Sequence, residues 1–184
     1  MLFVRHATTP GMRAACFPRE EDDADEASLA RAAALGLAAL PAWVAPARAA
    51  RRTAAALGLE PREAPALREA DCGRWRGLPY ERVAREEPEA LASWLTDPDA
   101  APHGGESLAA LAVRVAGWLE AARDEPEAVA VCDAGAIRAA LGHALGLGPQ
   151  ATARFDVAPL STTELVVTRD GWRVAHVNRK VWKS

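Results

Sequence analysis

The chain has 184 residues, a mass of 19.5 kDa and a formal net charge of −3; half of its residues are apolar and 26% are charged. This is the composition of a folded globular protein, and the length is that of one domain spanning residues 1–184. The small acidic excess leaves no basic surface for nucleic acid, and no apolar run approaches the roughly 20 residues that a membrane span needs.

The cysteines and the first residues indicate a cytoplasmic protein. Cys16, Cys72 and Cys132 are odd in number and far apart, which is the spacing of neither a disulfide framework nor a zinc site. We therefore expect reduced thiols. No cluster of metal ligands stands out in the sequence, and we expect neither a metal nor a cofactor. Arg5 follows only four residues, which argues against a signal peptide. Monomer and homodimer both remain open.

In the first half of the chain, short apolar runs typical of strands alternate with segments whose apolar residues have helical spacing. The run at 2–4 predicts a buried strand that ends at Arg5 and His6. Proline, glycine and acidic residues predict irregular structure after it. The expected elements are, in order, a strand at 2–4, a loop at 8–25, a helix at 29–40, a strand at 43–45, a helix at 47–57 and a loop at 61–80.

The second half continues the alternation and ends in a hairpin. Ser107 is a candidate N-cap for the clearest helix, and Asp170-Gly171 is a hairpin turn signal. The expected elements are helices at 80–94 broken at Pro88, a loop at 97–105, a helix at 107–123, a strand at 128–132, a helix at 135–145, and strands at 165–167 and 172–177.

This order predicts a three-layer α/β fold with a mainly parallel sheet and an antiparallel edge hairpin. In such sheets, ligands bind beyond the carboxyl ends of the strands. Arg5 and His6 follow one predicted strand, and Asp133 follows another. An arginine fork suits phosphate oxygens, and an imidazole beside it can attack phosphorus.

Four segments, in this order along the chain, resemble motifs of the histidine phosphatase superfamily, the phosphoglycerate mutase-like group. LFVRHATTPG at 2–11 resembles the family's LVRHGET. LREADCGRWRG at 67–77 is similar to its L-x-E-x-x-x-G-x-W-x-G segment and resembles most the α-ribazole phosphatase-like branch. PHGGES at 102–107 resembles PGGES. The segment at 129–147 resembles V-x-S-H-G-G-x-I-R, although Asp133 stands at the histidine.

The resemblance implies a phosphoglycerate mutase-like fold and a metal-independent phosphatase of a small phosphorylated molecule. His6 matches the nucleophile that becomes phosphohistidine, and Arg5 matches the first phosphate-binding arginine. Glu69 matches the proton donor to the leaving oxygen. The short insertions after Trp75 favour a phosphatase over a mutase.

Two positions depart from the family pattern in the phosphate pocket. Asp133 stands at the second histidine, and Ala49 stands at the second arginine, flanked by Arg48, Arg51 and Arg52. A carboxylate about 4 Å from a phosphate oxygen would repel it by roughly 4 kcal/mol at an effective dielectric near 20. One interpretation is therefore that Asp133 pairs with Arg5 and takes the place of phosphate.

Four further residues are candidate substrate contacts: Arg13, Arg48, His103 and Trp75. Three interpretations of the whole chain stay open. It is a phosphatase that uses phosphohistidine, a diverged relative with a repurposed active site for non-phosphate chemistry or a cationic substrate, or a non-catalytic binding domain.

Overall fold

The computed structural model describes residues 1–35, 37 and 40–180. Within these residues six strands form one sheet, in the order β3-β2-β4-β1-β5-β6. Neighbours from β3 to β1 are parallel, whereas β5 pairs antiparallel with β1 and with β6. The strands are β1 (Leu2–Arg5), β2 (Ala42–Val44), β3 (Arg62–Glu63), β4 (Val129–Cys132), β5 (Thr162–Thr168) and β6 (Gly171–Arg179).

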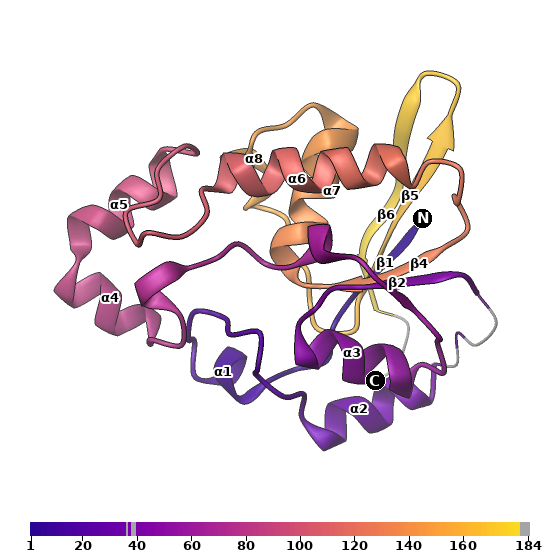
Figure 1. Cartoon of the computed structure of the whole chain (residues 1–184), viewed down its shortest axis with the longest axis horizontal. Coiled ribbons are helices and arrows are strands. Elements are labelled where there is room, and N and C mark those ends of the chain that lie inside the picture. The colour runs from indigo at the N-terminus through magenta and orange to yellow at the C-terminus, as the bar shows by residue number, and fades with distance from the viewer. Residues whose placement is uncertain (36, 38–39, 181–184) are drawn as a thin grey trace.

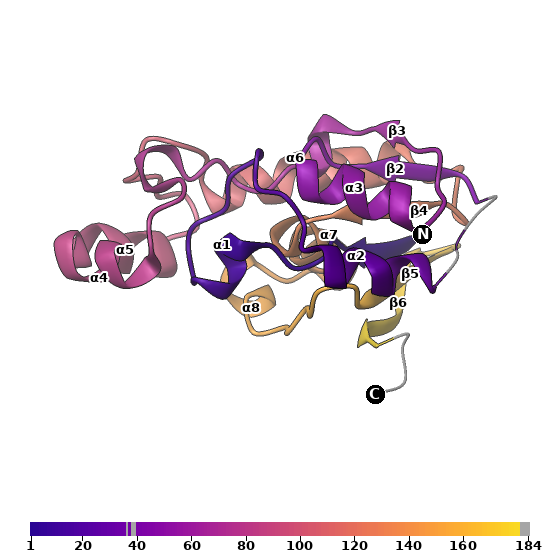
Figure 2. The same cartoon turned by 90° about the horizontal axis from the view of Figure 1, so that it is seen from below.

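Eight α-helices among the described residues complete the predicted α/β architecture. Helices α2 and α3 lie on one side of the sheet, and α6 and α7 lie on the other (Figure 1). Both views place α4 and α5 together at one end of the molecule, beyond the sheet (Figure 2). The helices are α1 (Pro10–Arg13), α2 (Glu26–Ala33), α3 (Arg48–Ala56), α4 (Tyr80–Glu86), α5 (Pro88–Thr96), α6 (Leu108–Ala121), α7 (Ala134–Leu145) and α8 (Pro149–Thr152).

The predicted caps and breakers define several of these elements. The Ser107 side chain accepts a hydrogen bond from the Ala110 N–H, so Ser107 is the N-cap of α6. Gly146 ends α7 with a left-handed backbone, at φ 66°, and Pro88 separates α4 from α5.

Some expectations about the loops were wrong. The loops predicted at 8–25 and 61–80 contain α1, the two-residue strand β3 and two 3₁₀ turns, Pro65–Leu67 and Gly73–Trp75. The helix expected at 29–40 begins earlier and ends at Ala33. Positions 36, 38 and 39 of that prediction lie outside the described residues. Short elements escape pattern reasoning because they contain too few residues to show a period.

The main hydrophobic core lies between the sheet and its helices and includes Phe3, Val4, Ile137 and Leu141. A second cluster of buried residues underlies α4 and α5 and consists of Phe17, Cys72, Trp75, Val83 and Leu91. The segment at 67–72 connects the two clusters and carries Glu69 to the start of α7, just beyond the carboxyl end of β4. No helix among the described residues is long and apolar enough to cross a membrane.

Candidate active site

The catalytic candidates lie where the parallel strands β1 and β4 end. Arg5 and Cys132 are register partners, so the residues that follow them, His6 and Asp133, become neighbours. The His6 N–H donates to the Cys132 carbonyl oxygen at 3.0 Å and extends the pairing by one residue. The sheet thus joins two side chains that are 127 positions apart in the sequence.

Both ring nitrogens of His6 have partners. Nδ1 lies 2.7 Å from the Ala7 carbonyl oxygen, which can only accept, so Nδ1 holds a proton. Nε2 lies 2.9 Å from Asp133 Oδ1. His6 is 5% exposed and Asp133 is 7% exposed. An ionised carboxylate also accepts only, so this second contact contains one proton, which belongs to an imidazolium or to a carboxylic acid.

The environment favours the proton on His6. Burial opposes a charged imidazole, but the charge of Asp133, its hydrogen bond and the Ala7 carbonyl together outweigh burial. The pKa of His6 is therefore raised above its ordinary value of 6.5, even though the charge of Arg5 opposes this rise. With a proton on Nε2, the lone pair that would attack phosphorus is not free.

The interpretation that Asp133 pairs with Arg5 was wrong, because the carboxylate contacts His6 instead. The Arg5 guanidinium donates from Nη1 to the carbonyl oxygen of Val157. Two polar atoms beside the pair, Arg5 Nε and Asp133 Oδ2, are buried and have no hydrogen-bond partner among the described residues. Burial lowers the pKa of Arg5, while the charges of Asp133 and Glu69 oppose that change. Unsatisfied buried atoms are costly and often mark a ligand site.

Glu69 is held by two backbone N–H groups. Its Oε1 accepts from the Ala70 N–H at 2.9 Å, and its Oε2 accepts from the Gly135 N–H at 2.8 Å. These bonds and the charge of Arg5 favour the ionised form, but burial and the charge of Asp133 outweigh them. The pKa of Glu69 is therefore raised above its ordinary value of 4.5, as suits a carboxylic acid that donates a proton.

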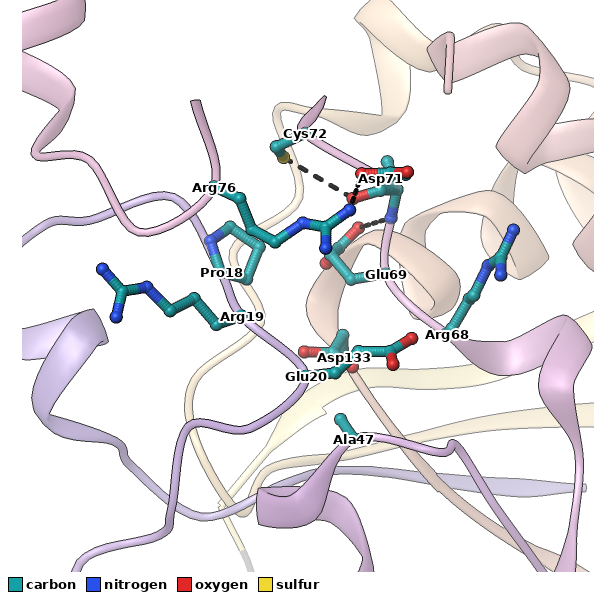
Figure 3. Close-up of a pocket in the computed structure, with 11 residues that line it drawn as sticks. Pro18, Arg19, Glu20, Ala47, Arg68, Glu69, Asp71, Cys72, Arg76 and Asp133 are labelled. Atoms are coloured by element: carbon teal, nitrogen blue, oxygen red, sulfur yellow. Dashed lines mark hydrogen bonds and ion pairs between the residues drawn. The ribbon is translucent and has the colours of Figure 1, made fainter. Parts of the chain in front are cut away.

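Glu69 and Asp133 line a cavity of about 200 Å³. Of its arginines, Arg76 extends toward Asp71 and bonds its Oδ1 at 2.6 Å, whereas Arg19 and Arg68 point away from Glu69 and Asp133 (Figure 3). The full lining is Pro18, Arg19, Glu20, Ala47, Arg68, Glu69, Ala70, Asp71, Cys72, Arg76 and Asp133.

The second arginine of the family pattern has no replacement from α3. Ala49 is 2% exposed and packs in the main core. The arginines that flank it form ion pairs with carboxylates outside the cavity lining: Arg48 and Arg52 with Asp23, at 3.4 and 2.9 Å, and Arg51 with Glu63, at 3.3 Å. These ion pairs hold the three guanidinium groups at Asp23 and Glu63, so none of them replaces the missing arginine in the cavity.

The four predicted substrate contacts do not line this cavity. Arg13 pairs with Asp25 at 2.7 Å, and Arg48 pairs with Asp23. Trp75 is fully buried, and His103 is 2% exposed with its ring centroid 4.8 Å from that of Trp75. Burial lowers the pKa of His103, so this histidine is a neutral packing residue. The loop composition that suggested a pocket rim could not reveal the second core beneath α4 and α5.

Two residues beside the catalytic candidates were missed in the sequence. Thr53 Oγ1 accepts from the Ala7 N–H at 2.9 Å and donates to the Ala49 carbonyl oxygen at 2.6 Å, so it fixes the backbone after His6. Gly135 holds Glu69, and its position one residue into α7 was the available signal. Cys72 also lines the cavity, but burial raises the pKa of its thiol to about 12, which makes it a poor nucleophile.

No group of three or more His, Cys, Asp or Glu side chains is arranged to hold a metal ion within the described ranges. The arrangement is a buried imidazole–carboxylate pair beside a carboxyl group with a raised pKa and a half-buried arginine. A model of the histidine phosphatase superfamily (branch 1) matches residues 1–180. The chain belongs to this superfamily.

Known relatives agree in fold. A glucosyl-3-phosphoglycerate phosphatase of Mycobacterium tuberculosis is 42% identical over 48 residues, which is 26% of this chain and only 22% of the relative's length. The solved mycobacterial glucosyl-3-phosphoglycerate phosphatase in complex with VO3 superposes with a TM-score of 0.83 at 24% identity, over 98% of each chain. The α-ribazole phosphatase of Shigella flexneri superposes with a TM-score of 0.84 at 16% identity, over 99% of this chain and 98% of that one.

Proposed function

We propose that this protein is a metal-independent phosphomonoesterase that acts on a small phosphorylated molecule through a phosphohistidine on His6. The observation that supports this most directly is the orientation of His6. Because Nδ1 is bonded to the Ala7 carbonyl, Nε2 is the nitrogen that faces Asp133. Asp133 and Glu69 both line the same cavity. His6 does not itself line the cavity, but Asp133, which contacts its Nε2, does, so the nucleophile lies one side chain away from the cavity that holds the proton donor. Phosphoryl transfer requires both of these groups close together.

The reaction has two steps. The Nε2 lone pair attacks phosphorus, the bond from phosphorus to the ester oxygen breaks, and Glu69 gives its proton to the departing alkoxide. Water then attacks the phosphohistidine while the Glu69 carboxylate takes a proton from it. Inorganic phosphate leaves, and neutral His6 and protonated Glu69 are restored. Arg5, with its buried Nε unpaired, donates to the phosphoryl oxygens.

Asp133 must change its protonation state for this chemistry to occur. In the resting pair, the proton on Nε2 blocks attack and the carboxylate repels phosphate. Moving that one proton from His6 to Asp133 frees the lone pair and turns the carboxylate into a hydrogen-bond donor. A bound phosphate dianion favours this transfer because its oxygen accepts a hydrogen bond from the protonated Asp133. Asp133 then does the work of the family's second histidine.

The nucleophile is tested with 4-nitrophenyl phosphate in the presence of a chelator. The parent protein hydrolyses it, and His6→Ala loses turnover. The control variant His176→Ala, at the far sheet edge, keeps it. A trapped acid-labile phosphoryl group on the parent, absent from His6→Ala, identifies the intermediate. Turnover that needs a metal, or that survives loss of His6, overturns the proposal.

The role of Asp133 is tested by the pH dependence of kcat/KM for the same ester. Its good leaving group makes the rate insensitive to Glu69, so the loss of the pair's proton produces the alkaline fall in rate. Asp133→Asn has an amide donor and no proton to lose, so this fall disappears. An unchanged alkaline limb removes Asp133 from this role.

A second candidate function rests on the same pair. His6 bonded to Asp133, together with Ala49 at the arginine position, is also what a site repurposed for non-phosphate or cationic ligands would contain. Vanadate separates the two, since a solved phosphatase of this fold binds VO3. Tight vanadate binding by the parent favours phosphoryl transfer, and no binding of vanadate or phosphate favours the repurposed site.

A further inference from the structure

A large apolar groove adjoins the catalytic cavity. It has a volume of about 690 Å³ and shares four residues with the cavity: Pro18, Glu69, Ala70 and Cys72. Its other walls come from Phe17, from α5, α6 and α7 and from the segment around α8. The two hollows therefore meet at the proposed proton donor.

The groove is lined by apolar side chains that are unusually exposed. Val113 on α6 is 74% exposed, Leu95 on α5 is 46% exposed and Leu147 after α7 is 40% exposed. Exposed large apolar side chains that gather in one hollow are typical of a ligand or partner surface, because leaving them in water is unfavourable.

Few charges are available in the groove. Apart from Glu69, its charged or basic side chains are Arg138 and His143. Arg138 donates from Nε to the Phe155 carbonyl oxygen at 3.0 Å, and His143 lies 2.6 Å from Glu120 Oε1. His143 is paired and Arg138 is the one arginine of the lining, so apolar side chains rather than charges dominate the groove.

The position of Glu69 determines which part of a substrate would enter the groove. A general acid must lie within hydrogen-bond reach of the leaving oxygen, so the alcohol portion extends from Glu69 and the phosphoryl group lies toward His6. We propose, on the basis of the proposed function, that the groove binds the leaving group and that the substrates are phosphate monoesters of apolar alcohols.

The test is a series of 4-alkylphenyl phosphates. The phenols of this series have closely similar acidity, so chain length changes apolar burial and leaves the chemical step alone. For the parent protein, kcat/KM rises roughly threefold to fourfold for each buried methylene until the groove is filled. A value of kcat/KM that does not change with chain length overturns the proposal.

Two variants test whether the dependence of kcat/KM on chain length arises in the groove. Ala116→Phe fills it from α6, and Val113→Asp adds a charge at a position that is already exposed. Both flatten the dependence on chain length, which is measured within each variant as kcat/KM for each alkylphenyl phosphate relative to that for phenyl phosphate. Ala110→Phe, exposed on the same helix and outside the groove lining, keeps the full dependence. A dependence that survives both groove variants overturns the proposal.

A second copy of the chain is the competing occupant of the groove. If the parent is a dimer, both groove variants are monomers and the chain-length series is unchanged, then self-association replaces this proposal. The proposed function fails separately, when phenyl phosphate is not hydrolysed or when hydrolysis survives His6→Ala. In that case calorimetry on His6→Ala still tests whether the groove binds an apolar group. Tighter binding of 4-hexylphenyl phosphate than of phenyl phosphate supports the groove proposal, and equal binding of the two overturns it.

Discussion

The backbone N–H of Gly135 donates to Glu69 Oε2 at 2.8 Å, and a methyl group at position 135 would overlap the Glu69 carboxyl group. This contact makes glycine at the start of α7 a condition for the position of the proposed acid.

Gly135→Ala should therefore displace Glu69 and impair proton donation. We expect kcat for phenyl phosphate to fall about 10- to 100-fold, part of the 10²–10⁴-fold that general acid catalysis supplies, with a smaller fall for 4-nitrophenyl phosphate. Gly117→Ala is the matched control, because open space surrounds that glycine within α6. It should gain roughly 0.5–1 kcal/mol of stability and keep full activity. Equal activity of both variants would contradict the contact's role.

Glu69→Gln should slow esters with poor leaving groups far more than esters with good ones. The amide keeps the shape of the side chain but has no acidic proton, and only a poor leaving group needs that proton. The expected fall in kcat for phenyl phosphate is about 10²–10⁴-fold. The control is Asp71→Asn, which makes the same kind of change at another carboxyl group of the cavity lining, one that is paired with Arg76. Equal slowing of both ester types would remove Glu69 from the role of acid.

Asp133→His should raise phosphatase activity, and adding Ala49→Arg should raise it further. The first change removes a carboxylate beside the phosphoryl group, and the second restores a cationic fork. Even a third of the roughly 4 kcal/mol of repulsion corresponds to about tenfold in rate. Because Thr53 links the Ala49 carbonyl to the backbone that follows His6, and His6 contacts Asp133, the two positions are coupled and the two gains should not be additive.

Vanadate affinity measured by inhibition should rise in parallel with turnover in these variants. Ala49→Met is the control for volume, since it enlarges the buried side chain of Ala49 without a charge. Folded variants with no gain in anion affinity or turnover would show that repulsion at Asp133 does not limit the reaction.

Stability should depend on pH through His6. The folded pKa is raised above 6.5, so the folded state binds more protons than the unfolded state between these two values. The stabilisation is fully present below about pH 6.5 and is lost as the pH rises through the folded pKa. The free energy of unfolding in urea should therefore fall over this range.

Asp133→Asn should remove most of that fall. Asp133 supplies the charge and the side-chain hydrogen bond that raise the pKa of His6, and without them burial lowers it. A pH dependence of unfolding that is the same in the parent and in Asp133→Asn would show that the pair is not ionised in the folded protein.

Thr53→Val should destabilise the protein by about 1–3 kcal/mol, because it leaves the buried Ala7 N–H without an acceptor. It should also lower turnover, since that N–H belongs to the residue whose carbonyl orients His6. Thr53→Ser keeps the hydroxyl and should recover most of both losses. Urea unfolding and 4-nitrophenyl phosphate turnover measure the two effects. Loss of stability with full turnover would limit Thr53 to a packing role.

The sequence by itself determined the architecture and the identity of the catalytic candidates. Apolar runs alternate with helical spacing along most of the chain, and this order allows few topologies other than the mainly parallel sheet that is observed. Four motifs in the family's order identified His6, Arg5 and Glu69 as candidates. They also showed where the chain departs from the family pattern, at Asp133 and Ala49.

Only the tertiary structure decided the partners of these residues. The register of Arg5 with Cys132 places His6 beside Asp133, and no local pattern encodes the offset between strands that are more than a hundred residues apart. The same limit explains why Arg48 and Arg13 pair with acids and why His103 is buried. Which side chains meet depends on how separate segments pack, because burial and charge pairing are properties of contacts distant in sequence.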